Sequence, residues 1–273
     1  MDLEKIEELE LLMEFFIEVG NSISGKKING QDGLKYAETI GKKTFSHISS
    51  AYHLMKGQKM NLSDGTYIDI VDHSSIAVLI RAALESYLTF NHVFISTLDL
   101  KEKEFRFLCW DLYGFIERKD FLAESEEAIN RLEQEKKLTI KSIDRIRTFE
   151  SYKKLKDKDK TKIEKGYWKL NKKWADLAEE AGFDRGIFID TYSYLCSYSH
   201  TGRLSATQIM QSKTKEEQMG LAKVLLGYAL MILSKFIIDY VKLIPETKPS
   251  FDSNQKGKNT ARLWKEIAEN IKK

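Results

Sequence analysis

The stretch 74–96, SSIAVLIRAALESYLTFNHVFIS, places apolar residues on nearly every side of the helix that it predicts. A helix that is apolar all round belongs in the interior of a protein. The same stretch holds Arg81 and Glu85, which are four residues apart and share one helical face, with His92 further along the same stripe. Because charged side chains are almost never buried without a partner, we expect this helix to hold a structural ion pair or to line a polar site.

Helical patterns continue through most of the 273 residues, and the two prolines, Pro245 and Pro249, both lie near the end of the chain. Since proline breaks helices, long uninterrupted helices are expected before that point. We therefore predict an all-α helical bundle, in which Asp72, Ser74 or Ser75 caps the central helix. The expected helices span residues 2–19, 34–60, 74–96, 99–122, 124–149, 174–181, 184–200 and 216–243. Only 66–71 alternates like a strand, and it could equally be a loop or a helix entry.

The domain organisation follows from the position of the two prolines. We expect one helical bundle domain over residues 1–245, followed by a basic C-terminal tail over 246–273. The tail contains one short helix with Trp264 and Ile267 as its apolar anchors. We expect this helix to dock loosely, or on a partner.

Composition indicates a protein of a reducing compartment. The two cysteines, Cys109 and Cys196, each lie in an apolar helical pattern, and the acidic N-terminus lacks the features of a signal peptide. The most apolar stretch, 221–244, is interrupted by four charged residues, so we interpret it as a buried helix rather than a membrane span. Cysteine spacing argues against structural zinc, and we expect a cytoplasmic protein with neither metal nor cofactor.

The segment 151–173 is rich in lysine, with ten lysines against three acidic residues. One interpretation is a solvated connection between helices. The other is an electrostatic footprint for a polyanion, with Tyr167, Trp168 and Trp174 as stacking surfaces. The lysines that would bind the polyanion in this second interpretation are Lys165, Lys169, Lys172 and Lys173.

A second polar stretch, YSYLCSYSHTGR at 192–203, ends its helical pattern in a histidine. At helical spacing Ser193, Cys196, Ser197 and His200 share one face. Histidine is suited to acid–base chemistry near neutral pH, so this face could form a cavity with His200 at its mouth. Alternatively, His200 is a helix-end residue that a backbone carbonyl satisfies.

Taken together, SSIAVLIRAALESYL and YSYLCSYSHTGRLS resemble the DUF5677 family of bacterial helical proteins, over about residues 35–245. That family is similar to the wider HEPN superfamily, many members of which are metal-independent ribonucleases of toxin–antitoxin and anti-phage systems. The resemblance implies a HEPN-like helical bundle with additional peripheral helices. It also implies RNA as a partner, a homo-oligomer such as a dimer, an antitoxin or defence-system partner, and no membrane.

The resemblance further implies a site. His200 would be the general acid or base, Arg81 would stabilise charge on the phosphoryl oxygens, and Glu85 would hold Arg81 in place. Residues lining the substrate would be Asn91, His92, Ser197, Tyr198 and Arg203. The usual HEPN motif places arginine and then histidine on one helix, with four to six residues between them. Residues 193–195, where that arginine would stand, are Ser, Tyr and Leu.

Two functions therefore remain open. Either Arg81 supplies its charge from another helix to a metal-independent endoribonuclease, or the protein is a non-catalytic helical interaction or accessory module. In the second case Arg81 and Glu85 form a structural pair and His200 satisfies a helix end.

Overall fold

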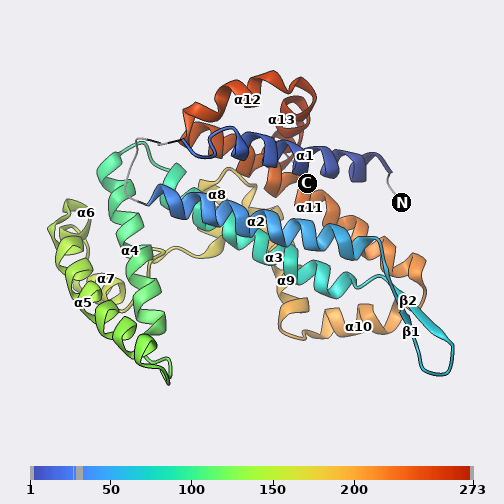
Figure 1. Cartoon of the computed structure of the whole chain (residues 1–273), viewed down its shortest axis with the longest axis horizontal. Helices are drawn as coiled ribbons and strands as arrows, with labels where there is room; N and C mark the ends of the chain where they lie inside the picture. Colours follow the sequence, from blue (N-terminus) through green and yellow to red (C-terminus); the bar gives the residue numbers. More distant parts are fainter. Residues whose placement is uncertain (1–2, 27, 29–32, 271–273) are drawn as a thin grey trace.

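The computed structural model describes residues 3–26, 28 and 33–270, and Figure 1 shows how its helices are arranged. The helices are α1 (Leu3–Asn21), α2 (Leu34–Met55), α3 (His73–Phe90), α4 (Leu100–Arg118), α5 (Glu126–Thr148), α6 (Glu150–Lys153), α7 (Asp157–Glu164), α8 (Trp174–Glu180), α9 (Arg185–Ser199), α10 (Arg203–Gln211), α11 (Lys215–Leu243), α12 (Lys248–Ser253) and α13 (Gln255–Asn270). A π-helical turn, η1, spans Asn91–Ile95 and a 3-10 turn, η2, spans Pro245–Thr247. The strands are β1 (Gln58–Asn61) and β2 (Tyr67–Ile70). The prediction of an all-α fold is confirmed, with one small hairpin in the described part of the chain.

The core lies where α3 and α11 meet α1 and α2 (Figure 1). Phe236 of α11 is fully buried and stacks on Phe90 of α3, with ring centroids 4.3 Å apart. The same ring contacts Phe16 of α1 and Tyr87 of α3. The sequence places large apolar residues on both helices, and their burial drives this packing. The prediction that 74–96 forms an interior helix is therefore confirmed for α3.

The central helix begins and ends in different ways. Its N-terminus is capped by Asp72, whose carboxylate accepts the backbone N–H of Ser75 at 2.9 Å. The expected single helix through residue 96 instead becomes a π turn after Phe90, in which the N–H of Ser96 donates to the carbonyl of Asn91. π turns often occur at functional sites, but this one packs into the interior.

The buried carboxylate of Asp239 in α11 fixes this end of α3. It accepts hydrogen bonds from the Tyr87 hydroxyl at 2.8 Å and from the Asn91 amide at 2.9 Å. Lys242 lies one turn along α11 and pairs with the same carboxylate at 2.8 Å. The buried charge therefore has a counter-ion and two donors, as burial of a charge requires.

The expected helix over 34–60 is shorter than predicted, because α2 ends at Met55. Gly57 follows with φ of +84°, a left-handed conformation that favours glycine and breaks the helix. The chain then forms an antiparallel hairpin in which β1 pairs with β2, so the alternating segment 66–71 contains a strand. Asp69 of the hairpin pairs with Lys215 of α11, which anchors it to the bundle.

The C-terminal residues after Pro245 form α12 and α13, which pack on α1 and α11 (Figure 1). Trp264 is buried and its indole N–H donates to Glu8 of α1 at 3.0 Å. Lys235 of α11, 2% exposed in its side chain, pairs with Glu269 of α13 at 2.7 Å. Helix α13 is thus held to the bundle by apolar and charged contacts.

Within the described residues, α11 is the one helix that is long and apolar enough to cross a membrane. Of its most apolar window, 67% is buried inside the protein. That burial is as expected for the core helix of a soluble protein. The prediction that 221–244 forms a buried or half-buried helix is therefore confirmed for the part of it that lies in α11.

Candidate functional site

Four polar side chains meet where the end of α9 lies against α3. The guanidinium of Arg81 donates through Nε to Glu85 Oε1 at 3.0 Å, and its Nη1 lies 3.1 Å from His200 Nε2. Its Nη2 donates to the Tyr192 hydroxyl at 3.4 Å, and that hydroxyl donates to Glu85 Oε1 at 2.6 Å. Arg81 and Glu85 come from α3, Tyr192 comes from α9, and His200 is the residue that caps α9.

The sequence of α9 explains why these groups face α3. Tyr192 and His200 are eight residues apart, two helical turns, and therefore lie on neighbouring positions of one face. Asp184 caps the start of the helix by accepting the N–H of Ile187. The helix ends at Ser199 with His200 as its C-cap, and Thr201 then adopts a positive φ of 53°, which does not continue the helix. The imidazole therefore sits at the exposed end of a fixed helix.

The Arg81–His200 contact defines the protonation state in which both groups can bond. A guanidinium can only donate, so this contact is a hydrogen bond when Nε2 of His200 accepts, which is the tautomer with the proton on Nδ1. Burial acts against the charge of Arg81, but the bond to Tyr192 and the charge of Glu85 outweigh it and raise the pKa of the guanidinium. Burial, followed by the hydrogen bond to Glu85, raises the pKa of the Tyr192 hydroxyl above its usual range.

The cluster is open to solvent. The side chains of Arg81 and Glu85 are 19% and 28% exposed, and His200 is exposed. The bonds to Glu85, His200 and Tyr192 occupy three of the five N–H groups of Arg81, so two remain available. An anion arriving from solvent could therefore bind the guanidinium while Glu85 and Tyr192 still hold it.

The end of the lysine-rich segment lies beside this cluster. The Trp174 ring lies 6.5 Å from the Tyr192 ring, and the Lys169 ammonium stands 4.2 Å from the centre of the Trp174 ring. Burial lowers the pKa of Lys169, and the nearby carboxylate of Glu85 opposes this. The two polar regions of the sequence thus converge on one place.

The other lysines of that segment lie in different surroundings. Lys172 pairs with Glu180. Lys173 caps α8 through its backbone N–H, which donates to Asp176 at 2.7 Å. Lys165 is exposed. Among the four lysines proposed for polyanion binding, Lys169 is the one whose contacts place it beside Glu85.

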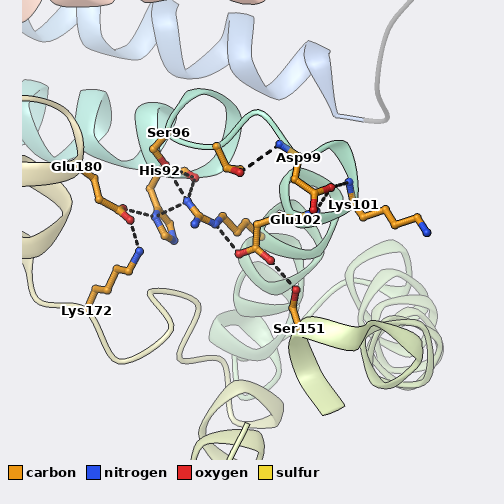
Figure 2. Close-up of polar contacts among 10 residues, drawn as sticks. His92, Ser96, Asp99, Lys101, Glu102, Ser151, Lys172 and Glu180 are labelled. Atoms are coloured by element: carbon orange, nitrogen blue, oxygen red, sulfur yellow. Dashed lines mark hydrogen bonds and ion pairs between the residues drawn. The ribbon is translucent and has the colours of Figure 1, made fainter. Parts of the chain in front are cut away.

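His92 and Asn91 lie inside the protein rather than beside Arg81. His92 is 1% exposed, and its Nδ1 lies 3.0 Å from Glu180 (Figure 2). Arg106 of α4 donates to the carbonyl of His92 at 3.1 Å, to Ser96 at 2.7 Å and to Glu102 at 2.9 Å. This network links η1 with α4 and α8. Asn91 is bound to Asp239 as described above.

Burial, and then the charge of Arg106, lower the pKa of His92, although the bond to Glu180 opposes them. His92 is therefore a neutral donor to Glu180. Burial alone would raise the pKa of Glu180, but the bonds from His92 and Lys172 outweigh it and lower that pKa to about 2. The network is a structural link between η1, α4 and α8. Its charged side chains are paired, Lys172 with Glu180 and Arg106 with Glu102.

Ser197, Tyr198 and Arg203 surround the turn that follows His200. The Ser197 hydroxyl accepts the N–H of Ser205 at 3.1 Å, which fixes α10 against α9. Tyr198 is buried and donates to Gln208 of α10 at 2.6 Å. Arg203 is exposed at the first position of α10. Ser197 and Tyr198 therefore position the turn that carries His200, and their polar atoms are used within the protein.

Tyr192 was missing from the residues expected at the site, although it bonds to both Arg81 and Glu85. Its spacing from His200 was available in the sequence, but many tyrosines share such a spacing with another polar residue. The position of Lys169 and Trp174 beside the cluster had no sequence signal, because it depends on how the segment after α7 returns to α3.

The carboxylate of Glu85 and the imidazole of His200 are the two side chains of metal-ligand type in this cluster. Within the residues that the structure describes, no group of three or more His, Cys, Asp or Glu side chains is arranged to hold a metal ion. The chemistry that the cluster offers is that of one imidazole, one guanidinium and the carboxylate and phenol that hold them.

Comparison with known proteins identifies the family. No curated protein and no solved structure gives a significant match to the chain. A family model described as a family of unknown function, DUF5677, matches residues 42–218, a span that contains Arg81, Glu85, Tyr192 and His200. Since this span covers more than half of the chain, the protein belongs to the DUF5677 family.

Proposed function

We propose that this protein is a metal-independent endoribonuclease of the HEPN type, with Arg81 and His200 acting on one phosphodiester. The observation that carries the proposal is the 3.1 Å contact between Arg81 Nη1 and His200 Nε2, two groups that reach one solvent-exposed point from different helices. One phosphate could contact both groups. Arg81, on α3, would supply the arginine that is lacking at positions 193–195 before His200.

The tautomer of His200 that accepts from Arg81 through Nε2 suits the role of general base. When substrate displaces the contact with Arg81, the Nε2 lone pair takes the proton of the ribose 2′-hydroxyl. The 2′-oxygen then bonds to phosphorus, the bond from phosphorus to the 5′-oxygen breaks, and solvent protonates the leaving oxygen. The products are a 2′,3′-cyclic phosphate and a 5′-hydroxyl. The nucleophile belongs to the substrate, so the step requires no metal-bound water.

Arg81 has the role of stabilising the negative charge that develops on the phosphoryl oxygens. Its two remaining N–H groups can bind those oxygens, and its position is fixed in advance by Glu85 and Tyr192. Glu85 and Tyr192 are positioning residues, because they act on substrate through Arg81. Such preorganised donors typically contribute on the order of 10²–10³-fold to a rate.

The proposal includes a biological setting taken from the HEPN resemblance. The fold would be a HEPN-like bundle with peripheral helices, in a cytoplasmic homodimer that binds RNA. The protein would act as a toxin or anti-phage effector and would be controlled by an antitoxin or another defence-system partner.

The alternative is a non-catalytic interaction or accessory module. The observation in its favour is that Arg81 already bonds to three protein groups and so cross-links α3 to α9. In this alternative the cluster stabilises the fold, and loss of His200 would change stability without changing any reaction on RNA.

The test is an RNA cleavage assay on the purified protein in EDTA, with analysis of the product ends. We expect cleavage with 2′,3′-cyclic phosphate and 5′-hydroxyl ends. His200→Ala should lower the rate about 10²–10⁴-fold, as loss of a general base does, while the fold survives. The matched control is His53→Ala, which removes an exposed histidine of α2 and should cleave at the wild-type rate.

Two results would reject the proposal. One is wild-type protein that leaves single-stranded RNA and structured RNA intact. The other is cleavage that His200→Ala retains at the wild-type rate, which would assign the activity to another site or to a contaminant.

A further inference from the structure

A groove of about 410 Å³ is lined by Glu85, the residue that holds Arg81. This volume lies within the range of roughly 300–1,000 Å³ that is usual for small-ligand clefts. One wall is the face of α3 that carries Ala82, Glu85, Ser86 and Thr89, which share a helical stripe. Glu85 therefore belongs both to the groove and to the cluster formed by Arg81 and His200.

The remaining lining is mostly aromatic. Tyr36 from α2 meets Trp110 from α4 edge to face, with ring centroids 5.6 Å apart. Trp168 and Trp174 meet in the same way at 6.2 Å. Tyr36, Trp110 and Trp174 are only partly buried, unlike the aromatic rings of the core. Partly buried rings in a cleft offer apolar faces to a planar ligand.

The charges at the groove favour an anionic ligand. Lys43 of α2 lines the groove, is exposed, and its side chain forms no hydrogen bond or ion pair with the described residues. Lys169 lies over Trp174, which also lines the groove, and Arg81 bonds to the groove-lining Glu85. One cation therefore lines the groove and two more contact residues that line it, while Glu85 is the acidic residue among the groove-lining side chains.

We propose that this groove binds the base of an unpaired nucleotide next to the reactive phosphate, so that the substrate is single-stranded RNA. The inference rests on the proposed ribonuclease function and names its substrate class. Arg81 and Glu85 are about 6 Å apart along the axis of α3. Stacked nucleotides rise about 3.4 Å each, so a base one or two positions from the bound phosphate reaches the groove.

The physical reason for single-strand selectivity is that a base must leave its stack to enter the groove. In a duplex the base is paired and stacked, and extracting it costs a few kcal/mol. In a single strand the base is free to stack on Trp110 or Tyr36 instead. Lys43 and Lys169 would then neutralise the neighbouring phosphates.

Binding of an uncleavable ligand tests the groove independently of the chemistry. The probe is a labelled 2′-O-methyl oligonucleotide, which lacks the 2′-hydroxyl that would attack, and the readout is fluorescence anisotropy. Trp110→Ala and Tyr36→Ala should each weaken binding about five- to a hundredfold, the usual loss for one stacking ring. Tyr67→Ala, which removes an exposed ring of the distant hairpin, is the matched control and should bind as the wild type does.

Two further binding measurements distinguish a loss of stacking from a loss of folding in the alanine variants. Trp110→Phe keeps an aromatic face and should recover most of the affinity. An oligonucleotide with abasic sites should bind the wild type weakly, and Trp110→Ala should weaken it no further. The proposal would be overturned if both alanine variants bound the labelled oligonucleotide as tightly as the wild type does, or if duplex and single strand bound equally well. It would also be overturned if a peptide, but not unlabelled oligonucleotide, displaced the labelled oligonucleotide.

The two proposals can fail separately. If the wild type cleaves RNA while both alanine variants bind the oligonucleotide normally, the groove proposal is wrong and the ribonuclease proposal stands. If the oligonucleotide binds in the groove but RNA is never cleaved, the ribonuclease proposal is wrong and the groove is a binding site for single-stranded nucleic acid.

Discussion

The guanidinium of Arg81 and the imidazole of His200 lie 3.1 Å apart, although 119 residues separate them in the chain. The contact joins the middle of α3 to the end of α9, and Glu85 and Tyr192 hold the arginine from both helices. The interior helix α3 and the end of α9 thus position both groups, while Arg81 is 19% exposed in its side chain and His200 is exposed. Such placement on rigid elements is what a binding or catalytic site requires.

Tyr192→Phe tests whether the bridging hydroxyl positions Arg81. The variant keeps the aromatic ring but removes the donor to Glu85 and the acceptor for Arg81. We expect a stability loss of about 1–2 kcal/mol, since the lost bond involves a charged partner. We also expect kcat for RNA cleavage to fall more than KM changes, measured by urea unfolding and steady-state kinetics. Wild-type kcat in a stably folded Tyr192→Phe protein would show that the hydroxyl has no positioning role.

Gly202→Ala tests whether the turn after His200 must be tight. A Cβ at this position would lie 2.6 Å from Ser197 Oγ and 3.1 Å from Ser197 Cα. The turn would have to move, which should cost about 1–3 kcal/mol and displace His200 from Arg81. The control is Gly220→Ala in α11, where a Cβ meets nothing within 4 Å. That change should stabilise the helix by about 0.5–1 kcal/mol. Equal unfolding midpoints for the two variants would contradict the prediction.

The sequence predicted the long α-helices well because their apolar residues repeat at helical spacing over long stretches, whereas the short helices α6, α7 and α10 were not expected. The helix of α3, its Asp72 cap and the pairing of Arg81 with Glu85 all follow from local rules. The strand β1 was missed because the helix over 34–60 was extended past Gly57, where the left-handed backbone in fact ends the helical conformation. Local patterns also gave the wrong surroundings for His92, whose burial depends on packing against α4 and α8.

The convergence of Arg81 with His200 came from family resemblance rather than from spacing. No local rule states which residue of α9 faces α3, and the site is built by tertiary packing. The position of Lys169 and Trp174 against this cluster depends on the return of the chain after α7, where Leu170 and Asn171 adopt positive φ. Such conformations in residues other than glycine are uncommon and are set by the surrounding structure.

Acid should destabilise the protein through His92 and Glu180. Both groups have a lower pKa in the folded protein than when unfolded, so the unfolded state binds more protons and stability falls as pH falls. The loss through His92 begins below pH 6.5. The loss through Glu180 runs from about pH 4.5 to pH 2 and amounts to at most about 3 kcal/mol. The midpoint of urea unfolding, measured at several pH values between pH 8 and pH 3, follows both losses of stability.

Glu180→Gln tests the loss of stability that we assign to protonation of Glu180, at the lower of the two pH ranges. The variant cannot ionise at position 180, so its stability should fall less steeply between pH 4.5 and pH 3 than that of the wild type. Parallel profiles for the two proteins below pH 4.5 would place the acid sensitivity elsewhere in the molecule.

The buried pair formed by Lys235 and Glu269 should anchor α13 to α11. Glu269→Gln leaves the ammonium of Lys235, 2% exposed, without its counter-ion and should cost about 2–4 kcal/mol. Lys235→Met replaces that charge with an apolar chain of similar length and should cost much less. Urea unfolding of the two variants checks the order. A larger loss for Lys235→Met would mean that the ion pair itself stabilises the fold.

The most direct test of the central claim is a double-mutant cycle on RNA cleavage with Arg81→Lys, His200→Asn and the double variant. If both groups act on one phosphodiester, removing the second after the first should change the rate little, because residues that act as a unit are strongly non-additive. We predict a double variant within about threefold of the slower single variant. The claim would be contradicted if the rate loss of the double variant equalled the product of the two single-variant losses. It would also be contradicted if the wild type did not cleave RNA.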